Sequence, residues 1–425
     1  MAKIRPISGF PEWLPEQRLV EQKVLDGLRS RFELYGFAPI ETRSVELLET
    51  LLAKGETDKE IYALKRLADS GAGDAGFGLH YDLTVPFARY AVQNYNELTF
   101  PFKRYQIQKA WRGERPQEGR YREFLQADID VIDRGSLALA FDAEVAWMVH
   151  ETLASLPFPP VTIRVNNRKV TEGYMRGLGI DEEDLVPGMR VLDKLDKVGA
   201  DGVRAMLGMD DSVVDKLLEL TTISSSSTSF VDEVRALGVT SELLDEGLEE
   251  LGFVMSELAG LPPGAVVADM GIVRGFDYYT GTVYEGVMQG HESLGAVCSG
   301  GRYDNLAAGA REPLPGVGIS IGVSRILGRL FGQGLLPAER KSPTVVLVAH
   351  VGEGPGTVVR ALRARGIPAE AYHEPAALKK QLAYANAKGI AYVWLPFEDG
   401  HQVRDMSSGD QAPGQADSWS PAPSA

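Results

Sequence analysis

The chain has 425 residues, 44% of them apolar and 24% charged, with a formal net charge of −15, six scattered histidines and one cysteine. This is the composition of a globular protein large enough for two or three domains, and its acidity excludes a protein that coats nucleic acid by bulk attraction. The single Cys298 excludes a disulfide framework and a cysteine-rich zinc site. No apolar run approaches the length of a membrane span, and the N-terminus has no signal-peptide core, so we expect a cytoplasmic protein without a structural metal or membrane contact.

The N-terminal region begins with two predicted helices. Residues 16–36 form an amphipathic helix ending at Gly36, because apolar residues recur every four positions. A second helix is predicted at 45–54. In the following HYDLTVPFARY (80–90), Asp82 and Thr84 would point the same way in an extended segment and together hold an ammonium group. A helix start with Thr84 as N-cap is an equally good interpretation.

Residues 99–133 alternate polar and apolar positions and predict an antiparallel hairpin. Gln126, Asp128 and Asp130 share one face of the second strand, and Arg104, Gln106, Gln108 and Arg112 share one face of the first. The connecting loop GERPQEGR is rich in arginine, whose planar fork binds phosphate at two points. A solvated loop is the plainer interpretation, but the polar face that adjoins it favours an anion-binding site.

The next region, residues 165–255, reads as a series of short helices and predicts a helical insertion. Strands return at 267–288 and 314–322. The first carries RGFDYYTGTVYEG (274–286), with an arginine and three tyrosines that in most strands only pack. SGGRYDNL (299–306) is predicted to be a Gly-Gly turn that presents Tyr303. GVGISIGVSRIL (316–327) is predicted to be a strand leading into a helix with Arg325 in its first turn, where arginine can stack on a base or reach a phosphate.

After a linker at 331–343, alternating strand and helix patterns predict a small α/β domain. The final SSGDQAPGQADSWSPAPSA is of low complexity and is expected to be disordered.

These segments resemble the histidyl-tRNA synthetase family of class II aminoacyl-tRNA synthetases. WRGERPQEGRYREF and GVGISIGVSRIL resemble two class-defining motifs, and RGFDYYTGTVYEG and SGGRYDNL resemble two motifs peculiar to the histidine enzymes. The resemblance implies an α+β fold with an antiparallel sheet flanked by helices. The implied domains are a catalytic domain at 1–164 and 256–335, a helical insertion at 165–255, a shortened anticodon-binding-like α/β domain at 336–405, and a disordered tail at 406–425.

The resemblance also implies a homodimer that uses ATP with Mg²⁺ to join L-histidine to its tRNA. It assigns roles to residues by position. The catalytic residues are Arg112 and Arg274; the ATP-binding residues are Arg112, Glu114, Arg120, Phe124 and Arg325. The histidine-binding residues are Asp82, Thr84, Arg112, Gln126, Asp130, Arg274, Tyr278, Tyr279 and Tyr303, with Asp130 and Tyr279 on the imidazole.

Such a site fits the chemistry of adenylation. The attacking carboxylate is already ionised, so the reaction needs positioning and charge stabilisation rather than a general base, and arginines with magnesium supply both.

Two other functions are compatible with parts of the pattern. The chain could be a non-catalytic, histidine-binding paralogue acting as regulatory subunit of ATP phosphoribosyltransferase, but such a subunit typically lacks the histidine-specific motifs, the insertion and the C-terminal domain, and has no need of Arg112, Arg274 and Arg325 together. The chain could also be a class II synthetase for another amino acid, and the acid and tyrosines of the pocket argue against apolar substrates.

Overall fold

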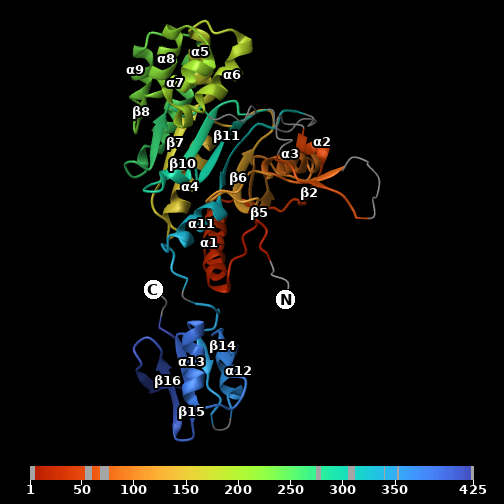
Figure 1. Cartoon of the computed structure of the whole chain (residues 1–425), viewed down its shortest axis with the longest axis vertical. Helices are drawn as coiled ribbons and strands as arrows, with labels where there is room; N and C mark the ends of the chain where they lie inside the picture. Colours follow the sequence, from red (N-terminus) through yellow and green to blue (C-terminus); the bar gives the residue numbers. More distant parts are fainter. Residues whose placement is uncertain are drawn as a thin grey trace. The chain divides into compact units, whose positions relative to one another are not determined.

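The computed structural model describes residues 5–52, 60–67, 76–273, 279–304, 312–338, 340–351 and 354–422. Two compact units are present, one comprising Met1–Pro11 and Leu25–Gln333 and the other Glu12–Val24 and Gly334–Ala425 (Figure 1). No helix in the described ranges is long and apolar enough to span a membrane.

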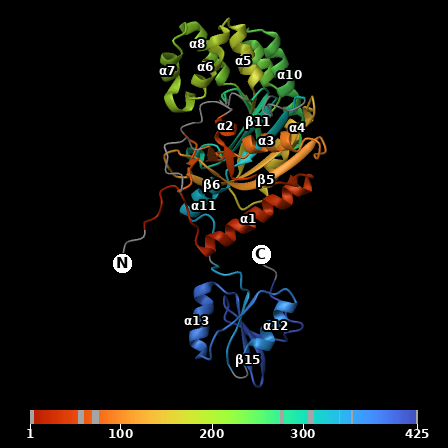
Figure 2. The same cartoon turned by 90° about the vertical axis from the view of Figure 1, so that its right-hand side faces the viewer.

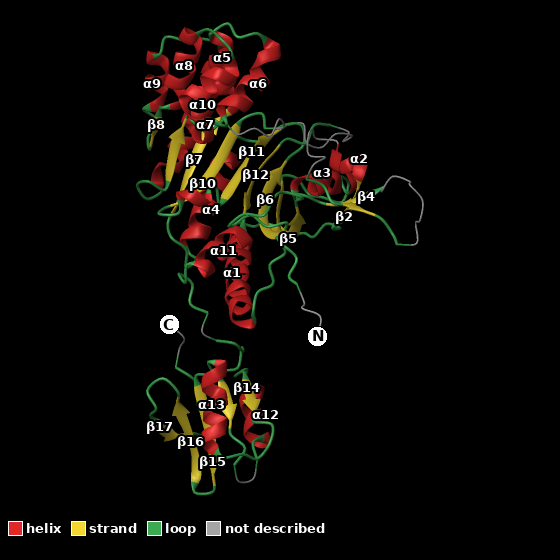
Figure 3. Ribbon diagram, viewed as in Figure 1, coloured by secondary structure: helices red, strands yellow, loops and turns green. Residues whose placement is uncertain are grey.

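A nine-stranded sheet forms the centre of the larger unit (Figure 3). Its order is β1-β5-β6-β12-β11-β10-β7-β9-β8, and neighbours run antiparallel except in the pairs β1–β5 and β7–β9. This confirms the predicted α+β fold with a mainly antiparallel sheet. The strands are β1 (Ala38–Pro39), β5 (Phe102–Trp111), β6 (Glu123–Ile132), β7 (Val161–Asn167), β8 (Ser224–Ser225), β9 (Val266–Asp269), β10 (Thr282–Met288), β11 (Cys298–Tyr303) and β12 (Gly316–Ile321).

Helices flank this sheet. The first, α1 (Pro15–Leu34), was predicted from its four-residue periodicity and packs beside β5, where the rings of Phe32 and Tyr105 lie 5.6 Å apart (Figure 2). The other flanking helices are α3 (Thr84–Gln93), α4 (Ala140–Ala154) and α11 (Val323–Gly332). The buried apolar face of α4, which includes Val145, Met148 and Val149, contributes to the core.

The predicted helix at 45–54 is wrong in its first part. Residues 45–47 form strand β2 (Val45–Leu47), and only Leu48–Leu52 are helical (α2). The cause is a tertiary pairing, because β2 joins β3 (Ala63–Leu64) and β4 (Phe77–Leu79) in a separate three-stranded sheet. Local periodicity does not report such a pairing.

The β5–β6 hairpin confirms the predicted alternation of faces. Arg104 lies opposite Asp130, Gln106 opposite Asp128, and Gln108 opposite Gln126. The polar face is nevertheless not open throughout, since Arg104 and Gln106 are 0% exposed and both aspartates are at most 4% exposed. The hairpin therefore carries a buried polar ladder, which is stable only if its charges are paired.

The helical region consists of α5 (Arg168–Gly177), α6 (Glu182–Leu192), α7 (Leu195–Leu207), α8 (Asp211–Thr221), α9 (Phe230–Ala236) and α10 (Glu242–Glu257). The expected boundary at 165 differs, because residues 165–167 belong to β7 in the main sheet. Glycines let α5 and α10 approach closely: a Cβ on Gly173 would lie 2.3 Å from the backbone nitrogen of Leu244.

The C-terminal unit contains a five-stranded sheet of order β14-β13-β15-β16-β17. Its elements are β13 (Val346–Val348), α12 (Gly356–Ala364), β14 (Ala369–Ala371), α13 (Leu378–Lys388), β15 (Tyr392–Phe397), β16 (Gly400–Asp405) and β17 (Gln411–Pro413).

The predicted disordered tail at 406–425 is wrong over its described part, 406–422. β17 pairs with β16, and the ring of Trp419 packs 5.7 Å from that of Trp394 in the core of the unit. Arg365 also donates a hydrogen bond to the carbonyl of Ala416 at 2.9 Å. A strand pairing, a tryptophan and an arginine hydrogen bond thus anchor a segment whose Pro, Ser and Gly content is otherwise typical of disorder.

Candidate active site

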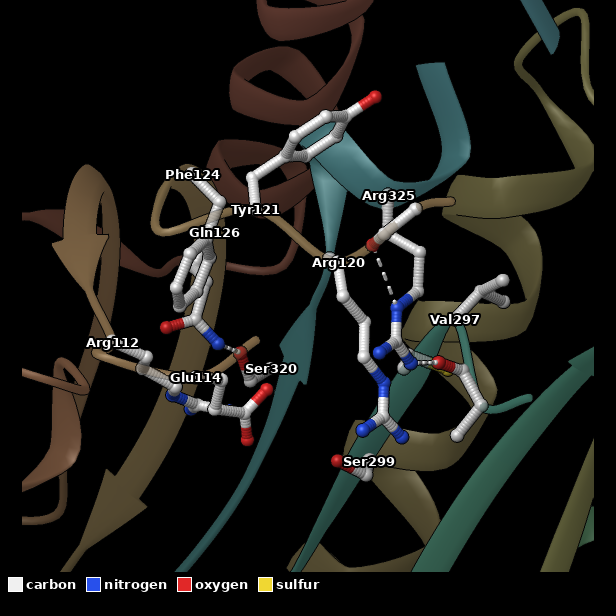
Figure 4. Close-up of a pocket in the computed structure, with 14 residues that line it drawn as sticks. Arg112, Glu114, Arg120, Tyr121, Phe124, Gln126, Val297, Ser299, Ser320 and Arg325 are labelled. Atoms are coloured by element: carbon white, nitrogen blue, oxygen red, sulfur yellow. Dashed lines mark hydrogen bonds between the residues drawn. The ribbon is translucent and has the colours of Figure 1, made fainter. Parts of the chain in front are cut away.

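A cavity of about 270 Å³, the outer cavity, opens beside the β5–β6 loop (Figure 4). Six residues predicted to bind ligand line it: Arg112, Glu114, Arg120, Phe124, Gln126 and Arg325. Figure 4 shows Arg112 and Arg325 on opposite sides, with the Glu114 carboxylate pointing into the space between them. Two arginines facing each other across a polar cavity are suited to a polyphosphate.

Arg112 follows β5 and is held in place before any ligand binds. Its Nε donates to the carbonyl of Tyr81 at 3.0 Å, and its guanidinium lies 5.1 Å from the ring centre of Phe124. One N–H donor and one face of the guanidinium are therefore used for positioning. Such a pre-oriented fork loses little conformational entropy when an anion binds.

Arg325 lies in the first turn of α11, as predicted. Its Nε donates to the carbonyl of Gly119 at 3.2 Å, and Nη1 donates to the carbonyl of Ala296. Arg325 thereby connects the hairpin loop to the start of β11 and α11. Arg120 extends alongside it toward Ser299 (Figure 4).

A second, inner cavity of about 20 Å³ adjoins the outer one, because Ser299 and Ser320 line both. Four of the residues predicted to bind histidine line it: Thr84, Asp130, Tyr279 and Tyr303. This volume matches a water-sized group, so an imidazole ring would enter only with movement of the lining side chains. Gln126 stands at the junction and donates to the Ser320 hydroxyl at 2.7 Å.

Asp130 is the most constrained acid of the inner cavity. Arg104 forms an ion pair with its Oδ2 at 2.5 Å, and the Tyr303 hydroxyl donates to its Oδ1 at 2.8 Å. Burial, together with the Asp130 charge, raises the pKa of Tyr303 well above its usual value, so the tyrosine remains a proton donor. The Arg104 guanidinium also lies 4.3 Å from the ring centre of Phe87.

The floor of the inner cavity consists of backbone. A Cβ on Gly318 would lie 2.2 Å from Oδ1 of Asp130, and one on Gly301 would lie 2.6 Å from the Tyr279 ring. The predicted Gly-Gly turn is therefore wrong: residues 299–303 lie in strand β11, and their glycines provide close approach rather than a reversal.

The segment around Asp82 starts helix α3. Oδ1 of Asp82 accepts a hydrogen bond from the backbone N–H of Val85 at 3.1 Å, and Thr84 is the first helical residue. The helix-start interpretation is thus correct, but the capping acceptor is Asp82 rather than Thr84. Thr84 lines the inner cavity, whereas Asp82 is not among its lining residues.

Two of the predicted residues, Arg274 and Tyr278, lie outside the described residues. Conversely, neither Arg104 nor Asp128 was predicted to bind ligand. Asp128 lines the inner cavity, and Arg104 is paired with Asp130, another acid of that cavity. Both residues were predicted to lie on the polar face of the hairpin that also carries Asp130, and this position could have indicated a role at the site.

Comparison with known proteins gives a consistent result. Residues 9–326 match the family model described as histidyl-tRNA synthetase. The histidine–tRNA ligase of Micrococcus luteus is 50% identical over 446 aligned residues, which cover 99% of this chain and 97% of that protein. The histidyl-tRNA synthetase structure from Nostoc sp. PCC 7120 is 35% identical, with a TM-score of 0.88 over 98% of both chains.

A third match is more distant. A structure from Bacillus halodurans, described as an ATP phosphoribosyltransferase regulatory subunit/histidyl-tRNA synthetase, covers 89% of this chain with a TM-score of 0.73. At 20% identity it shows a shared fold alone.

Proposed function

The chain belongs to the histidyl-tRNA synthetase family, and we propose that it ligates L-histidine to its cognate tRNA through a histidyl-adenylate, releasing pyrophosphate and AMP. The observation that carries this proposal is the junction of the two cavities. An arginine-lined outer cavity adjoins, at Ser299 and Ser320, an inner one lined by two buried acids and two tyrosines. ATP occupies the former, and the histidine side chain enters the latter as its lining side chains move.

In the first step, a carboxylate oxygen of histidine attacks the α-phosphorus of ATP, and the bond from that phosphorus to the bridging oxygen of pyrophosphate breaks. Arg112 lines the outer cavity and, as the family resemblance implies, holds the carboxylate and the α-phosphate together. Arg274 acts with it on the developing charge, as the family resemblance implies. Charge stabilisation by pre-positioned arginines is the main contribution the protein makes to such a reaction.

The remaining nucleotide contacts are proposed for residues that line the outer cavity. Phe124 stacks on the base, Arg325 covers the nucleotide, and Glu114 and Arg120 contact it near the phosphates. Mg²⁺ would be held by Glu114 together with the phosphates of ATP and would supply charge neutralisation there. The residues fit it: Glu114 lies beside Glu60, whose pKa is raised by burial and by the Glu114 charge, and Mg²⁺ bound to phosphates needs only one or two carboxylates.

For histidine, Asp82, Thr84 and Gln126 hold the amino group, Asp130 and Tyr279 contact the imidazole, and Tyr278 and Tyr303 close the pocket. The competing function, a regulatory subunit of ATP phosphoribosyltransferase, has less support. It gives no reason for Arg112 and Arg325 to face each other across a cavity. We further propose that the protein is cytoplasmic and forms a homodimer; sedimentation of the full chain tests the homodimer.

Replacing Asp130 by asparagine tests where histidine binds. The change keeps the size of the side chain but removes the acceptor charge, so KM for histidine in ATP–pyrophosphate exchange should rise by at least about tenfold, the scale of one buried polar contact. KM for ATP should change by less than about twofold. Asp130→Glu keeps the acceptor and should be milder. A variant that loses ATP affinity while histidine affinity is retained would place the imidazole elsewhere.

The C-terminal unit is proposed to bind the anticodon region of the tRNA. Lys379 and Lys380 are exposed at the start of α13, and reversing their charges should weaken a contact with phosphate. We expect Lys379→Glu with Lys380→Glu to raise KM for tRNA in aminoacylation by about tenfold and to leave pyrophosphate exchange unchanged. Unaltered aminoacylation would remove this surface of α13 from the tRNA contact.

A further inference from the structure

Asp128 is a buried carboxyl group that none of the steps above uses. It lies on β6 two residues from Asp130, so the two side chains share one face of the sheet. Only 2% of its surface is exposed, and both acids line the inner cavity. Two carboxyl groups buried this close together are unfavourable unless one is protonated or a ligand compensates them.

The neighbours of Asp128 leave one of its oxygens for a ligand. Ser320, its register partner on β12, hydrogen-bonds the carboxyl group. Gln106, opposite on β5, directs its amide nitrogen elsewhere, to Thr42 Oγ1 at 2.9 Å and Gln108 Oε1 at 2.6 Å. Within the described ranges, Oδ1 of Asp128 has no hydrogen-bond partner. Buried polar atoms in native proteins are seldom left in that condition without a functional reason.

The charges around Asp128 come from three elements. Arg104 on β5 attracts it, whereas Asp130 on the same strand and Asp82 before α3 repel it. The attraction is weakened because Arg104 is already paired with Asp130 at 2.5 Å. Burial is the largest influence and raises the pKa of Asp128 to about 7. The group therefore exchanges its proton near neutral pH, while Tyr303 donates to Asp130 throughout.

We propose that Asp128 is a second recognition group for the imidazole of histidine, with Asp130 accepting from one ring nitrogen and the Asp128 carboxyl group engaging the other. The proposal rests on the proposed function, because it requires the histidine side chain in the inner cavity. A neutral imidazole offers one N–H donor and one acceptor nitrogen. Ionised Asp130 complements the donor, and protonated Asp128 complements the acceptor.

This arrangement makes histidine binding dependent on one proton. That proton lies either on the Asp128 carboxyl group or on the ring nitrogen that faces it. In both arrangements the bound state contains one proton between these two groups. Above about pH 7, free Asp128 is ionised and free imidazole, of pKa about 6.5, is neutral, so binding takes up a proton from solution. KM for histidine should accordingly rise by up to about tenfold per pH unit above that point.

The test compares KM for histidine in pyrophosphate exchange between pH 6.5 and 8.5 in the full-length protein and three variants. In Asp128→Asn, the amide nitrogen donates to the ring without requiring a proton, so the rise of KM with pH should become shallower by about one decade per pH unit. The titration of free histidine is common to all four proteins and cancels. KM for ATP should change by less than about twofold in Asp128→Asn.

Asp142→Asn is the matched control. Asp142 is a buried acid on α4 whose pKa is raised to about 6 by burial, and it pairs with Arg302 at 2.7 Å rather than lining either cavity. This variant should keep the pH dependence of the unaltered protein. Asp130→Asn is the third variant and reports on the proposed function.

Folding of Asp128→Asn is checked by thermal unfolding. A carboxyl group whose folded pKa is raised stabilises the fold less as pH rises toward that value, so the variant should be at least as stable as the unaltered protein at pH 8.5. If Asp130→Asn raises KM but Asp128→Asn keeps the original pH slope, the role of Asp128 is wrong and the proposed function stands. If neither variant alters histidine KM, the histidine site is wrong and the proposal falls with it.

Discussion

Arg112→Ala should lower the rate of histidine-dependent ATP–pyrophosphate exchange by about a hundredfold to a thousandfold, the effect of losing one donor that stabilises transition-state charge. KM for both histidine and ATP should rise, because in the proposed function this arginine bridges the two substrates. Its side chain is oriented by Tyr81 and Phe124, so the loss includes a pre-positioned fork and not only a positive charge. Arg112→Lys, which keeps the charge, should recover only a small part of the rate.

The control for Arg112 is Arg115→Ala, in the same loop. Arg115 is exposed and does not line the outer cavity, so its removal should change the exchange rate by less than about twofold, as for a screened surface charge. Steady-state exchange with each substrate varied in turn measures both variants. Equal losses in the two would mean that the loop acts only as diffuse positive charge.

Arg104→Met should destabilise the larger unit by about 3–5 kcal/mol, the usual cost of removing one partner of a buried ion pair. Arg104 is 0% exposed and pairs with Asp130 at 2.5 Å, while Asp128 lies within reach of its charge. Methionine approximates the arginine stem, so the main loss is the cation that compensates two acids. The midpoint of urea unfolding, with its slope, measures the change.

Lys103→Met is the matched control for this prediction. Lys103 is the preceding residue on β5 and pairs with Glu144 at 2.5 Å, but both side chains are partly exposed, at 24% and 30%. A pair of that kind contributes at most about 1 kcal/mol. The double variant Arg104→Met, Asp130→Asn should be more stable than Arg104→Met alone, since it removes the unpaired charge. Failure of that recovery would show that Arg104 acts through packing against Phe87.

The sequence predicted the hairpin and its two faces because strand alternation is a local property. It did not predict that the polar face is buried, since burial there depends on β12, whose Ser320 is 194 residues from Gln126. For the same reason Arg104 had the correct parity but no assigned role. The alternation of residues along a strand shows on which face of the sheet a side chain lies. The partners of that side chain lie on other strands, and the alternation does not specify the order of those strands.

Two other wrong predictions, the Gly-Gly turn and the disordered tail, have equally specific causes. Glycines at 300 and 301 suit both a turn and a strand that needs close approach, and only the neighbouring Gly318 and Tyr279 decide between them. In the tail, composition indicated disorder, but the pairing of β17 with β16 and the aromatic contacts of Trp419 order the segment. For the candidate site, the family resemblance supplied Thr84, Asp130, Tyr279 and Tyr303, whereas Asp128 required knowledge of what its neighbours already bind.

The strand order also has a consequence for synthesis on the ribosome. During translation, β6 cannot pair with β12 until β12 has been synthesised. At a translation rate of about 5–20 residues per second, the separation of 194 residues between Gln126 and Ser320 corresponds to roughly 10–40 s with one edge of the hairpin unpaired. An open edge of apolar residues would invite pairing with other nascent chains. Strand β6 carries Gln126, Asp128 and Asp130, and inward-pointing charges such as those of the two aspartates oppose pairing with other chains. The acids proposed to select histidine thus also protect the chain while it is still incomplete.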